Sequence, residues 1–109
     1  MEWWTHLWLN EGFATFMEYL CIDAIYPDWE IFDEFIGSTF YPAMKLDAME
    51  SSHAIEIPIK HLSEIDDIFD TISYCKGAAI IRMLYHWIGE SSFKAGMHNY
   101  LKKVSFISV

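Results

Sequence analysis

Apolar residues at helical spacing occupy most of this chain, and that pattern constrains its fold more than any other feature. Apolar residues that recur three and four positions apart cover one side of an α-helix. The first such run lies between Asn10, a residue type suited to an N-cap, and Pro27, which stops a helix. Its apolar positions are Phe13, Phe16, Met17, Leu20, Cys21 and Ala24. We therefore expect one helix between Asn10 and Pro27.

A second helix is expected from Asp28, as its N-cap, to about Asp47. Gly37 and Pro42 lie inside it and should weaken or bend it, because glycine is a poor helix former and proline has no N–H to donate. The predicted apolar stripe of this helix consists of Phe32, Phe35, Ile36, Thr39, Phe40 and Ala43.

Helical spacing returns at Ile72 and is expected to end near Gly89, a residue type common just after a helix. Its predicted stripe consists of Ile72, Ala79, Ile80, Met83, Leu84, Trp87 and Ile88. A last helix, capped by Ser91 or Ser92, is expected to run to Val104. Its predicted stripe consists of Phe93, Met97, Tyr100, Leu101 and Val104.

The periodicity fails from Ala48 to Phe69, where serines, Pro58 and scattered acids predict a long irregular loop. A short extended piece is expected at Ile55 to Ile59. Such a long loop in a compact domain is usually functional or marks missing neighbours. The sequence thus predicts an all-α fold of about four helices with one long irregular loop.

Charge and composition exclude several classes of function. The chain has 109 residues, with 7 Lys+Arg against 16 Asp+Glu, for a net charge of −9. Binding to nucleic acid needs clustered basic residues, so that class is excluded. A content of 53% hydrophobic and 17% aromatic residues is too high for a disordered acidic tail. A chain of this length holds at most one domain and has little material for a deep cleft of its own.

The expected location of the protein is the cytoplasm. The sequence has no basic start followed by an apolar run, and no uncharged stretch long enough to span a bilayer. We therefore expect a soluble protein with no membrane segment. Cys21 and Cys75 do not form a C-x-x-C pair and are expected to be reduced thiols.

The histidines do not predict a complete metal site. None of the five belongs to an H-x-x-x-H pair or is followed by glutamate as in H-E-x-x-H. Catalytic zinc needs about three protein ligands and an open position for water. An acidic cluster of Glu64, Asp66, Asp67 and Asp70 could attract the cationic end of a peptide, or could be a solvated loop face.

Two motifs resemble a known family. The segment W-L-N-E-G-F-A at residues 8–14 resembles the segment that follows H-E-x-x-H in the M1 family of zinc aminopeptidases, and it is most similar to the puromycin-sensitive branch. The resemblance implies that Glu11 is the third zinc ligand. It also implies that H-E-x-x-H would fall before Met1, so that Met1 would be an internal methionine of the family sequence.

The second motif, F-D-T-I-S-Y-C-K-G-A at residues 69–78, resembles the family's F-D-x-I-S-Y-x-K-G-A signature. The resemblance gives Tyr74 the role of hydrogen-bonding the oxyanion of the tetrahedral intermediate. Such a donor is typically worth about 100- to 1,000-fold in rate. Without the resemblance, Tyr74 would be a packing aromatic in the first turn of a helix.

The resemblance extends over nearly the whole chain and has clear departures. Ser52-His53-Ala54-Ile55 stands where the family usually has S-H-P-I, and Arg82-Met83-Leu84 continues the pattern after Tyr74. The family's G-x-M-E-N motif is absent. Residues 105–109 match nothing in the family pattern.

The resemblance implies that residues 1–104 are the C-terminal part, after H-E-x-x-H, of a thermolysin-like M1 catalytic domain. It implies one Zn²⁺ in the complete site and peptide substrates that lose their N-terminal residues. We expect the chain alone to be inactive, because only Glu11 and Tyr74 of the site are present. The alternatives are a non-catalytic helical module that associates with other helical segments or a homologue, and an unstable truncation product.

Overall fold

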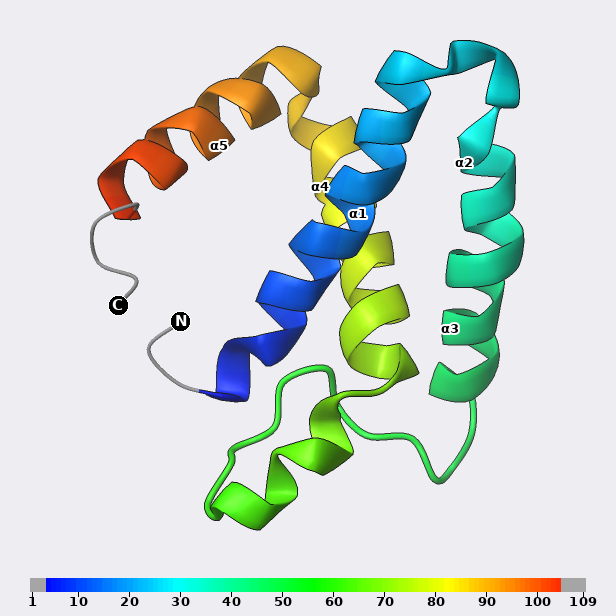
Figure 1. Ribbon diagram of the computed structural model, residues 1–109. Helices are drawn as coiled ribbons and strands as arrows, with labels where there is room; N and C mark the ends of the chain where they lie inside the picture. The colour runs from blue at the N-terminus through cyan, green and yellow to red at the C-terminus, as the bar shows by residue number, and fades with distance from the viewer. Residues whose placement is uncertain (1–3, 105–109) are drawn as a thin grey trace.

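The structure is a computed structural model that describes residues 4–104, and the predicted unmatched tail, 105–109, lies outside the described residues. Every regular element in the described range is helical, and the range contains no strand. The helices form four rods. In Figure 1, α1 crosses α4 at the centre, the rod that ends in α3 stands on one side, and α5 projects on the other. The predicted all-α fold of about four helices is confirmed.

The first rod is the 3₁₀ turn η1 (Trp4–His6) followed by α1 (Leu7–Ile25). The helix begins earlier than predicted, so Asn10 lies inside it and is not its N-cap. No side chain caps the start at His6; instead Leu7 is buried against Ile59 and Ile68. Burial rather than capping therefore fixes this end. The predicted stop is confirmed, since Pro27 opens the separate 3₁₀ turn η2 (Pro27–Trp29).

The second rod joins α2 (Ile31–Glu34), the π-helical segment η3 (Phe35–Phe40) and α3 (Tyr41–Asp47). Asp28 is not its N-cap, because Asp28 belongs to η2 and Glu30, at φ +49°, breaks the chain direction first. The predicted weakening near Gly37 and Pro42 is confirmed as a π-helical segment. Pro42 has no N–H to donate, and the N–H of Tyr41 bonds the carbonyl of Ile36, one residue beyond the α-helical partner.

The third rod is the π-helical segment η6 (Ile72–Lys76) continued by α4 (Gly77–Ile88), and the fourth is α5 (Glu90–Val104). Gly89 ends α4 at φ +83°, as its residue type predicts. Ser91 and Ser92 do not cap α5. The carbonyl of Gly89 already accepts the N–H of Phe93 at 3.0 Å, so the helix starts at Glu90 and both serines lie inside it.

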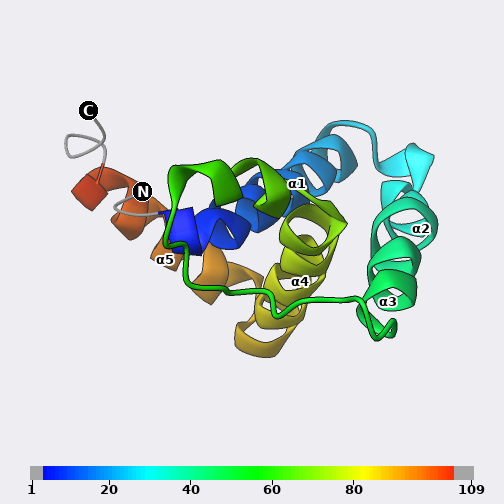
Figure 2. The ribbon, with the colours of Figure 1, turned by 90° about the horizontal axis from the view of Figure 1, so that it is seen from below.

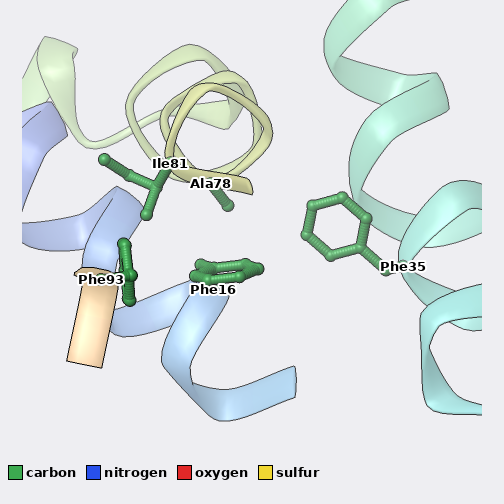
Figure 3. Close-up of a cluster of buried hydrophobic side chains, with 5 residues drawn as sticks. All are labelled: Phe16, Phe35, Ala78, Ile81 and Phe93. Carbon is green, nitrogen blue, oxygen red and sulfur yellow. The ribbon is translucent and has the colours of Figure 1, made fainter. Parts of the chain in front are cut away.

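The main core lies where α1, α4, the second rod and the first turn of α5 meet. Figure 3 shows its buried side chains: Phe16, Phe35, Ala78, Ile81 and Phe93. The guanidinium of Arg82 lies 5.5 Å from the ring centres of Phe32 and Phe35, which adds a cation–π contact between α4 and the second rod.

Several predicted stripe residues are exposed. On α4 the buried residues are Gly77, Ala78, Ala79 and Ile81, of which only Ala79 belongs to the predicted stripe, whereas Met83 and Trp87 are 67% and 85% exposed. Cys21 and Ala24 on α1 are exposed as well. α4 is apolar on more than one side, so spacing alone did not identify the side that packs.

The long loop between α3 and η6 is irregular, as predicted, with two 3₁₀ turns, η4 (Leu62–Glu64) and η5 (Asp66–Ile68). The expected extended piece at Ile55 to Ile59 forms no strand. Ile59 and Ile68 instead bury Leu7, which anchors the loop over the start of α1. Figure 2 shows the loop passing from the end of α3, beneath α4, to the start of α1.

Two further findings concern the described residues. None of the helices within residues 4–104 is long and apolar enough to cross a membrane. Cys21 and Cys75 are both free thiols, which agrees with the predicted reduced state.

Candidate functional site

Glu11 and Tyr74, which are far apart in the sequence, come together in the fold. Glu11 lies in the N-terminal half of α1, and Tyr74 lies in the π-helical segment η6 that packs against it. Both side chains are half-buried. The carboxylate of Glu11 is close enough to the phenol of Tyr74 to affect it by charge and by a hydrogen bond. The two site residues that the sequence singles out are therefore neighbours.

A close crossing of two glycines positions this pair. A Cβ placed on Gly12 would lie 2.6 Å from the carbonyl carbon of Gly77, and one placed on Gly77 would lie 2.9 Å from the carbonyl oxygen of Trp8. Real side chains do not tolerate such distances, so only glycine fits at either position. The crossing holds the backbones of α1 and α4 together directly beside Glu11 and one turn after Tyr74.

The pKa of Tyr74 is raised above its ordinary value of 10.0. Burial is the largest cause, because it disfavours the charged phenolate, and the negative charge and hydrogen bond of Glu11 act in the same direction. Tyrosine is already protonated at neutral pH, and the raised pKa keeps the O–H of Tyr74 as a hydrogen-bond donor into more alkaline solution.

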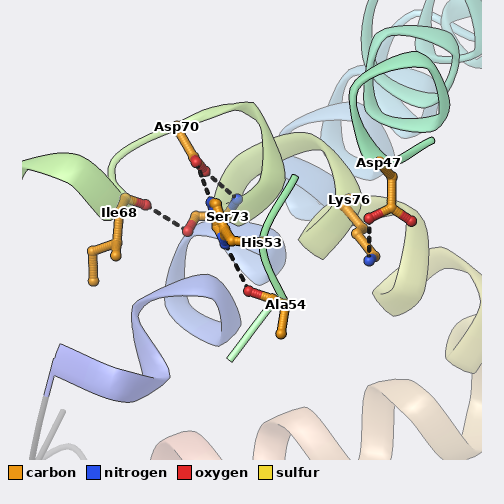
Figure 4. Close-up of polar contacts among 7 residues, drawn as sticks. All are labelled: Asp47, His53, Ala54, Ile68, Asp70, Ser73 and Lys76. Atoms are coloured by element: carbon orange, nitrogen blue, oxygen red, sulfur yellow. Dashed lines mark hydrogen bonds and ion pairs between the residues drawn. The ribbon is translucent and has the colours of Figure 1, made fainter. Parts of the chain in front are cut away.

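The turn that carries Tyr74 is held at both ends (Figure 4). At its start, the N–H of Tyr74 donates to the carbonyl of Asp70 at 3.1 Å, and the N–H of Ser73 donates to Asp70 Oδ1 at 2.9 Å. The buried hydroxyl of Ser73 donates to the carbonyl of Ile68. At its end, Lys76 Nζ lies 2.6 Å from Asp47 Oδ1, at the end of α3.

His53, in the long loop, contacts the same turn. Its Nε2 lies 2.5 Å from Asp70 Oδ2 and its Nδ1 lies 2.7 Å from the carbonyl oxygen of Ala54. The pKa of His53 is raised above its ordinary value of 6.5, chiefly by the hydrogen bond with Asp70, while burial opposes the shift. Asp70 is thus bonded on both carboxylate oxygens.

The acidic cluster does not act as one group. Glu64 Oε2 accepts the backbone N–H groups of Lys60 and His61, and Asp70 is engaged by His53 and Ser73. Only Asp66 and Asp67 are exposed. The interpretation as a loop face fits this arrangement better than a peptide-attracting patch.

The residues in the described range do not by themselves fit a zinc ion. Within residues 4–104, no group of three His, Cys, Asp or Glu side chains converges on one point. Glu11 supplies a single carboxylate beside a phenol, whereas catalytic zinc is held by about three protein ligands. Any zinc site that includes Glu11 needs further ligands.

Sequence reasoning missed the tethers of the Tyr74 turn. The sequence alone assigns no role to Asp47, His53 or Lys76, and it does not reveal the close contact between Gly12 and Gly77. His53 and Asp70 each lie in a motif that resembles the family pattern, and this is the one sequence signal that marks them. Their contact leaves no periodic pattern, because it joins two residues of a loop.

Comparison with known proteins identifies the protein family of this chain. The model of the peptidase family M1 domain matches residues 1–109, so this chain belongs to peptidase family M1.

Its relatives are aminopeptidases. It is 54% identical to Aminopeptidase M1-D of rice (Oryza sativa subsp. japonica) over 106 residues, 97% of this chain and 12% of the rice protein. It is 47% identical to Aminopeptidase M1 of Arabidopsis thaliana over 97% of this chain and 12% of that protein. For the protein named "Aminopeptidase 2, mitochondrial" of Saccharomyces cerevisiae, the values are 44%, 97% and 11%. The chain thus spans about one eighth of the length of these curated relatives.

Proposed function

We propose that this chain supplies one wall of the active site of a zinc aminopeptidase, which removes N-terminal residues from peptides. Glu11 provides one carboxylate ligand to the zinc, and Tyr74 donates a hydrogen bond to the oxyanion of the tetrahedral intermediate. The observation that carries this proposal is the pairing of Glu11 with a Tyr74 phenol that remains protonated at neutral pH. Membership of peptidase family M1 supports it.

Each residue has a distinct task in this proposal. Zinc, when bound, supplies an activated water. Tyr74, held by Asp70 and Lys76, presents its O–H where negative charge develops, an arrangement effective because the donor is already oriented before the reaction. Glu11 offers a fixed carboxylate, and its charge adds to the effect of burial in raising the pKa of Tyr74. We propose that the other zinc ligands lie outside residues 4–104, so the chain alone is inactive.

A chimera tests the proposal directly. In it, this chain replaces the matching 106 residues of rice Aminopeptidase M1-D. We expect the chimera to bind zinc and to hydrolyse an aminoacyl p-nitroanilide in a chelator-sensitive manner. Glu11→Gln should lower the zinc content measured by mass spectrometry. Tyr74→Phe should keep the zinc but lower kcat about 100- to 1,000-fold.

Matched controls lie on the same elements. Glu18→Gln changes an exposed carboxylate of α1, and Tyr41→Phe changes an exposed tyrosine of α3; both should leave zinc content and kcat unchanged. Full zinc content in Glu11→Gln, or full kcat in Tyr74→Phe, would refute the assigned role. Chelator-sensitive hydrolysis by the purified chain alone would refute its inactivity.

A second candidate function is association with another helical segment or a homologue. Met83 and Trp87 form an apolar, exposed side of α4, which favours this candidate. The cytoplasmic location stays a prediction.

A further inference from the structure

The hydrogen bonds of His53 determine how many protons its ring carries. Nδ1 faces the carbonyl oxygen of Ala54 at 2.7 Å, and a carbonyl oxygen can only accept, so Nδ1 carries a proton. Nε2 faces Asp70 Oδ2 at 2.5 Å, and an ionised carboxylate also only accepts, so the proton between them belongs to the pair as well. With Asp70 ionised, both contacts are satisfied together when His53 is an imidazolium.

Asp70 connects His53 to the turn that carries Tyr74. One of its carboxylate oxygens bonds His53 and the other accepts the N–H of Ser73, while its backbone carbonyl accepts the N–H of Tyr74. Figure 4 shows both contacts of the Asp70 carboxylate, one with His53 and one with Ser73. Asp70 therefore helps to fix the first turn of η6, together with the bond from the Ser73 hydroxyl to Ile68, and His53 reaches Tyr74 through Asp70.

The surroundings of the pair make it sensitive to pH. His53 and Asp70 side chains are 31% and 28% exposed, so solvent screens their attraction only in part. Two charged groups act on His53: the Asp70 carboxylate, which favours the imidazolium, and Lys76 of η6, which opposes it. Neutral His53 would lose one of its two hydrogen bonds.

We propose that His53 is a positioning residue for Tyr74, and that its protonated ring, acting through Asp70, holds the turn that aims the phenol. This rests on the proposed function only in that Tyr74 is the donor to the oxyanion. Because folding raises the pKa of His53, the stabilisation is fully present below the unfolded value near 6.5 and is lost as the pH rises through the folded value. The Tyr74 turn should therefore loosen in mildly alkaline solution.

Hydrogen exchange of the chain tests the positioning without reference to activity. At about pH 6, His53→Gln should exchange the amides of residues 70–77 about tenfold faster than the parent, because opening of a locally stabilised turn controls their exchange. The ratio should approach one at a pH above the folded pKa of His53, where the parent has lost the same contact. His98→Gln, an exposed histidine of α5, is the matched control and should exchange like the parent.

NMR titration of the histidine rings gives a second readout. The pKa of His53 should lie above 6.5 in the parent and fall in Asp70→Asn, because the hydrogen bond with Asp70 is the largest cause of the shift. An unshifted His53, or an exchange ratio that does not vary with pH, would overturn the proposal.

Kinetics of the rice chimera separate this proposal from the function on which it rests. His53→Gln should lower kcat about tenfold with little change in KM, because a displaced donor mainly affects the transition state. In a Tyr74→Phe background the same change should cost nothing further. An equal loss in both backgrounds would refute positioning through Tyr74. Full activity of Tyr74→Phe alone would refute the role of Tyr74 and leave the exchange and NMR results to decide the contact between His53 and the turn.

Discussion

At the scale of single residues, the site depends on the Tyr74 phenol and on the Glu11 carboxylate placed beside it. Burial is the largest cause of the raised pKa of Tyr74, and the negative charge and hydrogen bond of Glu11 add to it. A donor for a developing oxyanion must keep its proton at working pH, so this arrangement suits the chemistry proposed for it. The sequence gives the two residue types, whereas their pairing arises from the packing of η6 on α1.

The first prediction concerns the ionisation of Tyr74. Glu11→Gln removes the negative charge, so the pKa of Tyr74 should fall toward 10 and remain above it, because burial, the largest cause of the shift, is unchanged. A titration followed by the ¹³Cζ signal of Tyr74 in labelled chain measures this. Glu18→Gln, an exposed carboxylate further along α1, serves as the control and should leave the Tyr74 titration as it is. An equal shift in both variants would show that net charge, and not proximity, sets the pKa.

At the scale of the elements, the crossing of α1 with α4 determines whether the site exists. Gly12 and Gly77 let the two backbones approach so closely that no other side chain fits between them. Two π-helical segments, η3 and η6, adjust the register of the rods on either side of this crossing. Such segments often occur at functional sites, and η6 carries Tyr74.

Substitution of the crossing glycines tests its importance. Gly12→Ala should lower the free energy of unfolding by about 1–3 kcal/mol, because its methyl group forces α1 and α4 apart. Gly96→Ala is the control, since Gly96 lies in α5 with no atom near its missing Cβ. That variant should gain about 0.5–1 kcal/mol from the better helix propensity of alanine. Chemical denaturation measures both, and equal stability of the two variants would contradict the steric argument.

The sequence predicts the elements better than it predicts their contacts. Helical spacing locates all four rods, and Pro27 and Gly89 mark two of their ends. The starts of three helices are wrong because burial of Leu7, the turn at Glu30 and the carbonyl of Gly89 replace the expected caps. Motif resemblance finds Glu11 and Tyr74. It does not reveal the links from Asp47 and His53, because contacts between segments far apart in sequence leave no periodic pattern.

At the scale of the whole molecule, the chain is more open than its length requires. Its radius of gyration is 15.0 Å, against about 13 Å for a compact domain of this size. A groove of about 420 Å³ separates α1 from α5 and is lined by Leu9, Asn10, Phe13, Met97, Tyr100 and Leu101. The groove leaves apolar surface uncovered on α1 and α5, in addition to the exposed Met83 and Trp87 on α4.

This uncovered surface should cause the chain to self-associate. Light scattering is expected to show a mass that rises with concentration, and Trp87→Lys should shift the chain toward monomer, because Trp87 is 85% exposed on α4. Ser91→Lys adds the same charge at an exposed position without removing apolar surface, so it should associate like the parent. A monodisperse parent that binds no apolar dye would contradict this prediction.

The long loop has a consequence for how the chain withstands proteases. Lys60 is exposed and lies between His53 and Asp70, so trypsin can cleave the backbone there. Cleavage would leave Ile59 on one fragment and Ile68 on the other, and we expect both to stay packed on Leu7 as in the intact chain. The ion pair between His53 and Asp70 also joins the two fragments. A nicked chain should therefore keep its two fragments associated and the surroundings of Tyr74 intact. A denaturing gel would show two bands, although the native protein still runs as one species.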